Sequence, residues 1–105
     1  MKIPLISESG PAWLDINRLM AVTITGDKLY FTSQGGVYEA PTSLKHWEDI
    51  LQNEDFTSAS RSSIVRPDLA VKYDRKENIL VFDTKRGYQL IKVSRSNQKK
   101  MEDLF

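Results

Sequence analysis

Apolar and polar residues alternate over short stretches in the first 40 residues, which is the pattern of half-buried β-strands. Stretches of this kind are residues 3–6, 12–16, 19–25, 29–33 and 37–40. Turn-forming sequences separate them, above all Gly26-Asp27-Lys28 and Gln34-Gly35-Gly36. The first part of the chain therefore predicts a run of short antiparallel strands.

The same kind of pattern returns after Asp55. Strand signals occupy residues 56–65, 69–74, 79–83 and 88–93, and charged or glycine-containing turns separate them. No internal repeat or low-complexity segment interrupts the series. Together with the first 40 residues, this pattern predicts a mainly β protein.

Two segments break the pattern with helical spacing. In residues 44–52 the apolar side chains recur every three to four positions, and Thr42 or Ser43 is a suitable N-cap. We expect His46 on the solvated side of this middle helix, without a chemical role. The C-terminal residues 94–105 predict a short last helix, which Ser94 or Ser96 caps and which Met101, Leu104 and Phe105 hold against the core.

The length of 105 residues predicts one domain, residues 1–105, and its 40% apolar and 28% charged residues are typical of a folded soluble protein. The chain has no cysteine, which excludes disulfides, thiolate metal sites and a cysteine nucleophile, and fits a reducing compartment. The apolar N-terminal run is too short for a signal peptide, and no stretch is long enough to cross a bilayer. We therefore expect a cytoplasmic protein.

Charge is distributed unevenly along the chain. Residues 1–55 hold 4 Lys and Arg against 8 Asp and Glu, a net charge of −4, whereas residues 56–105 hold 11 against 6, a net charge of +5. Such an asymmetry favours a polyanionic partner for the basic half. A solvated basic face without a partner is the equally good alternative at this point.

Enzymatic sites find little support in the sequence. His46 is the only histidine, and we expect it on the solvated side of a helix, so the chain has no other imidazole to act as the base of a hydrolytic triad. A zinc site would need several Cys or His ligands, and the chain has only this one. Gly35-Gly36 lacks the spacing of phosphate-binding loops and indicates a turn. Acidic pairs such as Glu54-Asp55 are typical of solvated loops. We expect no catalytic residues, no metal, no cofactor and no small-molecule substrate.

Residues 56–65, Phe-Thr-Ser-Ala-Ser-Arg-Ser-Ser-Ile-Val, resemble the signature of LytTR domains, F-x-R-x-H-R-S-x-I-V-N. The matching residues are Phe56, Arg61, Ser62, Ile64 and Val65. A second match is Val93-Ser94-Arg95, which resembles the V-S-R-R opening of the family's C-terminal helix. The order of β-rich start, one helix, signature, hairpins and short last helix agrees as well, so the resemblance covers nearly the whole chain.

The sequence departs from the signature at several basic or polar positions. Ser58 replaces the basic residue, Ser60 the histidine, Arg66 the asparagine and Ser96 the second arginine. These departures reduce the basic surface near the motif, although Arg66 restores one charge.

The resemblance implies a fold of short antiparallel strands in stacked sheets, elongated, with one middle helix and a short C-terminal helix. It also implies a bacterial, response-regulator-like transcriptional regulator that binds specific double-stranded DNA, its loops entering successive major grooves. By position, the DNA contacts would be the Gly26-Asp27-Lys28 turn, the region of Arg61, and Arg95.

Arg61 and Arg95 are the candidates for base reading, because a guanidinium fork can pair with the O6 and N7 atoms of guanine. Arg61 bracing a carboxylate and Arg95 as a solvated helix-start residue are the alternatives. The candidate phosphate contacts are Lys28, Arg66, Lys92, Lys99 and Lys100. The hydroxyls of Ser60 and Ser62 could donate hydrogen bonds to phosphate oxygens, although serines in turns usually bind local backbone groups.

An alternative function is a LytTR-like protein-interaction module, or an antagonist of a related regulator, that has lost specific DNA binding. The weakened signature and the net charge of +1 motivate it. Two further partners are left open: a second copy on repeated DNA sites, and a separate inhibitory membrane protein, with which some family members lacking a receiver domain are associated.

Overall fold

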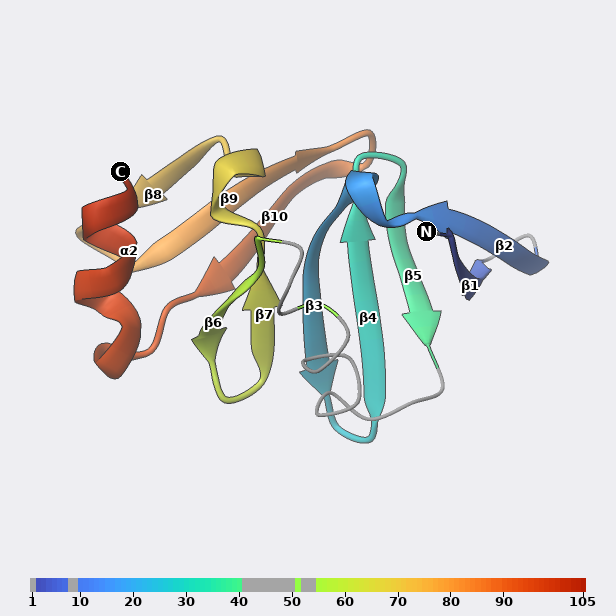
Figure 1. Cartoon of the computed structure of the whole chain (residues 1–105), viewed down its shortest axis with the longest axis horizontal. Coiled ribbons are helices and arrows are strands. Elements are labelled where there is room, and N and C mark those ends of the chain that lie inside the picture. The colour runs from blue at the N-terminus through green and yellow to red at the C-terminus, as the bar shows by residue number, and fades with distance from the viewer. Residues whose placement is uncertain (1, 8–9, 41–50, 52–54) are drawn as a thin grey trace.

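The computed structural model describes residues 2–7, 10–40, 51 and 55–105, and it is built almost entirely of antiparallel strands (Figure 1). Seven strands form the larger sheet, in the spatial order β2-β1-β5-β4-β3-β7-β6. Their bounds are β1 (Lys2–Ser7), β2 (Gly10–Asp15), β3 (Leu19–Thr25), β4 (Lys28–Ser33), β5 (Gly36–Ala40), β6 (Thr57–Ser60) and β7 (Ser63–Val65).

A smaller three-stranded sheet has the order β10-β9-β8; β8 lies near the C-terminal helix, and the β9–β10 hairpin runs toward the β4–β5 turn of the larger sheet (Figure 1). The strands of the smaller sheet are β8 (Lys72–Asp74), β9 (Ile79–Thr84) and β10 (Gly87–Lys92). The helical elements are η1 (Ile16–Arg18), η2 (Pro67–Leu69), η3 (Arg95–Asn97) and α2 (Gln98–Leu104). The dimensions of 38 × 28 × 26 Å give the molecule one longer axis.

The expected mainly β, antiparallel architecture and the short C-terminal helix are confirmed. The predicted middle helix, residues 44–52, lies outside the described residues apart from Leu51, which is fully buried. His46 lies outside them too.

The predicted serine cap of the C-terminal helix is wrong in detail. Ser94 holds the N-cap position of η3, but its hydroxyl accepts no backbone hydrogen bond there, and Asn97 is the N-cap of α2.

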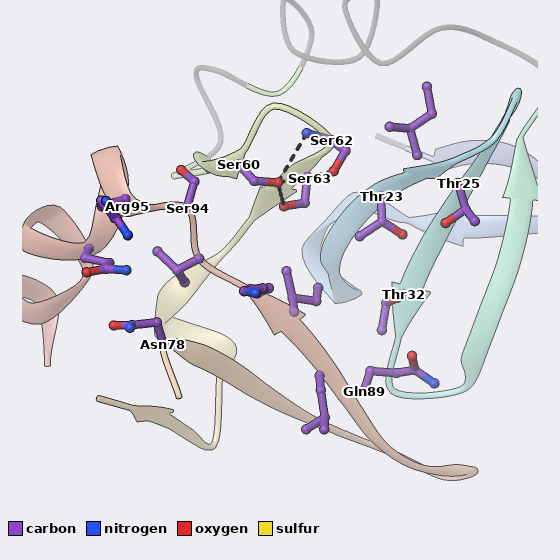
Figure 2. A pocket seen from close by; sticks show the side chains of 16 residues that line it. Thr23, Thr25, Thr32, Ser60, Ser62, Ser63, Asn78, Gln89, Ser94 and Arg95 are labelled. Atoms are coloured by element: carbon purple, nitrogen blue, oxygen red, sulfur yellow. Dashed lines mark hydrogen bonds between the residues drawn. The ribbon is translucent and has the colours of Figure 1, made fainter. Parts of the chain in front are cut away.

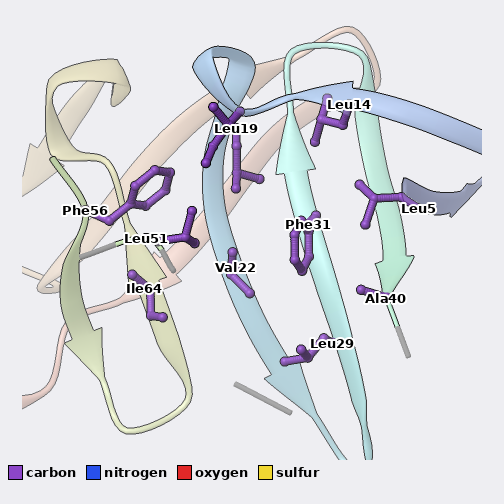
Figure 3. Close-up of a cluster of buried hydrophobic side chains, with 11 residues drawn as sticks. Leu5, Leu14, Leu19, Val22, Leu29, Phe31, Ala40, Leu51, Phe56 and Ile64 are labelled. Carbon is purple, nitrogen blue, oxygen red and sulfur yellow. The ribbon is translucent and has the colours of Figure 1, made fainter. Parts of the chain in front are cut away.

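β3 supplies side chains to two separate hydrophobic cores. Its register against β4 shifts between Leu19 and Ala21, which marks a β-bulge at Met20. Leu19 and Val22 therefore belong to one core, which includes Phe31, while Met20 and Ala21 belong to the other (Figure 3). Burial of both faces explains why residues 19–22 form a continuous apolar run rather than an alternating one.

The second core joins the two sheets and the C-terminal helix. It contains Ala59 and Val65 of the larger sheet, Phe82 of the smaller sheet and Met101 of α2, all buried. The sheets are also linked at the hairpin tips, where the N–H of Lys85 donates to the carbonyl of Gln34 at 2.8 Å. These contacts hold β6, β10 and η3 in one arrangement.

Phe82→Ala should remove the largest fully buried side chain of this joining core. Phe82 is fully buried, so the cavity left behind should lower the free energy of unfolding by about 3–5 kcal/mol. Urea denaturation measures the loss. Val71→Ala is the control, because Val71 is 57% exposed and its truncation should change stability by less than about 0.5 kcal/mol. Equal effects of the two changes would contradict this assignment of the core.

Candidate nucleic-acid interface

The turn between β6 and β7 holds Arg61 at the surface. The Ser60 hydroxyl accepts a hydrogen bond from the N–H of Ser62 at 3.2 Å, and its Oγ lies 2.8 Å from that of Ser63. The Ser62 carbonyl accepts from the N–H of Ile24 at 2.8 Å, which joins the turn to β3. Local hydrogen bonds thus satisfy the turn, as expected for a serine turn, and the Arg61 side chain is exposed.

No salt bridge of Arg61 occurs within the part of the chain that the structure describes. The alternative that it braces a neighbouring carboxylate therefore has no support among these residues. Its guanidinium is available to an external partner.

The second candidate arginine, Arg95, begins η3 immediately after β10. The N–H of Ser94 donates to the carbonyl of Ala59 at 2.8 Å, which fixes the start of η3 against β6. The side chain of Arg95 is exposed. Two segments far apart in the sequence, one carrying Arg61 and the other Arg95, thus meet in the fold.

A polar groove of about 750 Å³ lies between the larger sheet and β10 (Figure 2). Hydroxyl and amide side chains dominate its lining: Thr23, Thr25, Thr32, Ser60, Ser62, Ser63, Asn78, Gln89 and Ser94. The charged residues among its described lining are Lys92 and Arg95, both cations. The groove therefore offers hydrogen-bond donors and positive charge without an opposing carboxylate from these residues.

A second hollow, of about 510 Å³, connects the two arginine-bearing segments. Ser58, Ser60 and Arg61 line it from β6 and its turn, and Ser94, Ser96 and Asn97 from the start of the C-terminal helical segment. Ser60 and Ser94 line both hollows. Arg61 and Arg95 accordingly belong to one continuous surface.

Lys28 stands at the start of β4, directly after the two-residue turn Gly26-Asp27, in which Gly26 has a φ of +66°. Its ammonium forms an ion pair with Glu39 on β5 at 3.1 Å, and the hydrogen bond to that carboxylate raises the pKa of Lys28. Lys28 is therefore charged at neutral pH, but part of its charge is neutralised by Glu39.

The sequence suggested Arg66 as a phosphate contact, and its burial contradicts that expectation. Its side chain is only 8% exposed, its guanidinium lies 4.5 Å from the centre of the Phe56 ring, and its Nη1 donates to the carbonyl of Asn17 at 3.0 Å. It joins the start of β3 to the segment after β7 and does not reach the surface in this conformation. Lys99 and Lys100, by contrast, are exposed in the first turn of α2.

The structure adds groove residues that the sequence did not single out. Thr23 and Thr25 lie two apart on β3, so their alternation was a readable sign of a polar strand face. Gln89 on β10 and Asn78 before β9 gave no such sign, because only the packing of the two sheets brings them to the groove.

The described residues offer neither a metal site nor a membrane-spanning helix. Within the described ranges, no three His, Cys, Asp or Glu side chains gather as a metal site would require. None of the described helices is long and apolar enough to cross a membrane.

The fold and this surface define a class of protein: a β-domain that presents arginine-bearing loops around a polar groove. The sequence matches the LytTr DNA-binding domain model over residues 12–105. The chain therefore belongs to the LytTR DNA-binding domain family.

A solved structure has the same fold. It is the LytTr DNA-binding domain of a protein described as a methyl-accepting/DNA response regulator from Bacillus cereus, with a TM-score of 0.75 and 19% identity. The alignment covers 98% of this chain and 94% of that one. No individual curated protein matches the sequence significantly.

Arg66→Met should separate structure from binding. The change keeps an apolar stem but removes the cation over Phe56 and the hydrogen bond to Asn17, so we expect a loss of about 1–3 kcal/mol in unfolding free energy. Urea denaturation measures it, with Arg61→Met at an exposed site as control. A stable Arg66→Met protein that binds DNA tenfold more weakly would show that Arg66 acts on DNA after all.

Proposed function

We propose that this chain is a sequence-specific double-stranded DNA-binding domain that regulates transcription, and that Arg61 and Arg95 read bases. The observation that carries the proposal is the exposure of both arginines around hollows that share Ser60 and Ser94. Since a planar guanidinium can donate two parallel hydrogen bonds to one guanine edge, two such groups on one surface supply sequence discrimination.

The turns also lie in a favourable arrangement. The β3–β4 turn, the β6–β7 turn and the start of the C-terminal helical segment all occupy the same side of the molecule, the lower side in Figure 1. A duplex along that side would meet all three. The proposed entry of these loops into successive major grooves follows from this arrangement.

Phosphate contacts fall to the lysines around the arginines. Lys99 and Lys100 are exposed beside Arg95, and Lys92 lines the groove. A flexible ammonium suffices there, because a phosphate contact positions the protein without reading sequence. Lys28 is a weaker candidate for a phosphate contact, because its ammonium is paired with Glu39. The Ser62 hydroxyl can donate a neutral hydrogen bond to a phosphate oxygen.

A protein-interaction module or antagonist is the second candidate. The ion pair of Lys28 with Glu39 and the burial of Arg66 favour it, since both remove cations from the surface that the sequence led us to expect. Retention on duplex DNA at low salt separates the two functions, because an interaction module has no reason to be retained. Self-association on repeated sites and an inhibitory membrane partner stay predictions.

Salt dependence tests the phosphate contacts. Arg61, Arg95, Lys92, Lys99 and Lys100 are the cations that we assign to DNA, and the logarithm of the binding constant should fall with the logarithm of salt concentration with a slope of about −3 to −5. Fluorescence anisotropy of a labelled duplex over a salt series measures the slope. Binding that does not change with salt would contradict the assignment.

Single alanine variants separate base readers from phosphate contacts. Arg61→Ala and Arg95→Ala should each cost about 1–3 kcal/mol on the best site, selected from random duplexes, and less on an unrelated duplex. Lys99→Ala and Lys100→Ala should weaken both duplexes by smaller, similar amounts and reduce the salt slope by about one.

Thermal unfolding must first show that each variant is folded. If the arginine variants are folded and discriminate between the two duplexes as well as the parent does, the base-reading assignment is wrong.

A further inference from the structure

The two proposed base readers depend on a connection between segments that are distant in sequence. Arg61 follows β6, and Arg95 begins η3, which follows β10. The two segments meet at one backbone carbonyl, that of Ala59 in β6. The relative position of the backbone segments that carry Arg61 and Arg95 therefore depends on how η3 is held to Ala59.

Asn97 completes this connection. Its side-chain Nδ2 donates to the Ser94 hydroxyl at 2.8 Å and lies 3.3 Å from the carbonyl of Ala59, which also accepts the N–H of Ser94. Its own N–H donates to the Ser94 carbonyl at 2.9 Å. We call this set of hydrogen bonds among Ala59, Ser94 and Asn97 the clasp.

The clasp spans Arg95, one of the two proposed base readers. Ser94 is the N-cap of η3 and Asn97 is its last residue, so the two enclose Arg95 in a segment of three residues in 3₁₀ conformation. Such a short turn has little stability of its own, because its hydrogen bonds are few and poorly aligned. Without Asn97, one backbone hydrogen bond, from Ser94 to Ala59, would connect the turn to β6.

We propose that Asn97 is a positioning residue for sequence recognition: it fixes Arg95 relative to Arg61 without contacting a base itself. The inference rests on the proposed function, because it assumes that both arginines read DNA. Readers on separate segments need a rigid shared support, since bidentate pairing tolerates deviations of only about 0.5 Å. A carbonyl that accepts two donors from one turn provides such a support.

Asn97 also holds the N-cap position of α2, but its side chain makes no capping hydrogen bond there, so its hydrogen bonds to Ser94 and Ala59 can be tested without removing a cap. Asn97→Ser keeps a residue type that is favoured at N-caps, but its short hydroxyl cannot replace the amide that reaches Ala59. Asn97→Ala removes the side-chain hydrogen bonds altogether. Ser96→Ala is the matched control: Ser96 lines the same hollow and its Oγ lies 3.3 Å from that of Ser94, yet it has no hydrogen bond to β6.

The first measurement needs no DNA. Amide hydrogen exchange of Ser94 should accelerate about fivefold to tenfold in Asn97→Ser and Asn97→Ala, because the opening of the turn loses one hydrogen bond. Exchange of Ile24, which donates to Ser62, should stay unchanged, as should both amides in Ser96→Ala. Unchanged exchange of Ser94 overturns the clasp, and acceleration at all amides would indicate general destabilisation and overturn it as well.

The second measurement uses the preferred duplex. In the parent, Arg95→Ala should weaken binding at least about fivefold; in the Asn97→Ser background the same change should cost less than about twofold, because Arg95 is already displaced. The cost of Arg61→Ala should be the same in both backgrounds. An undiminished cost of Arg95→Ala in the Asn97→Ser background would show that Asn97 acts independently, for example by its own DNA contact, and overturns the proposal.

If the proposed function is wrong, the two experiments give a different pattern of results. If the parent does not discriminate between duplexes, base reading is wrong, and with it the role of Asn97 in recognition. The exchange experiment then still decides whether the clasp holds η3. If the parent discriminates but the Asn97 variants behave like Ser96→Ala in both measurements, the proposed function stands and the positioning role does not.

Discussion

The burial of β3 on both faces is the constraint on which the rest of the structure depends. A bulge at Met20 turns the strand so that Leu19 and Val22 pack on one side while Met20 and Ala21 pack on the other. One strand thereby connects the core that includes Phe31 with the core that joins the two sheets. Because both cores need β3 in one register, a shift of this strand would displace the β6–β7 hairpin, which pairs with it.

The polar groove begins where this double burial ends. After Val22 the strand carries Thr23 and Thr25, and the two sheets diverge around the polar groove instead of closing over an apolar core. At the edge of this groove, short hydrogen bonds hold the Ser60 turn, which carries Arg61. Different parts of the same strands thus have different surroundings: the buried ends hold the sheets, and the polar ends lead into the loops.

The candidate site was partly readable from the sequence. Arg61 and Arg95 stood out because each lies in a short motif, and local turn geometry is enough to expose them. Lys28 and Arg66 were placed with them by charge and by position in the resemblance, and neither reveals a neighbour from another strand. Glu39 pairs with Lys28 across the β4–β5 ladder, and Phe56 covers Arg66, so both cations are occupied by residues that only the fold brings near.

By itself, the sequence determined the antiparallel β character, the positions of the main turns and the short last helix, because alternation, turn residues and capping are local properties of the chain. Only the tertiary structure decided which strand is buried twice, which arginine is internal, and how the Ala59 carbonyl brings Ser94 and Asn97 to β6. These features depend on contacts between residues tens of positions apart. Such contacts are set by the packing of the two sheets as a whole, which no local pattern along the chain encodes.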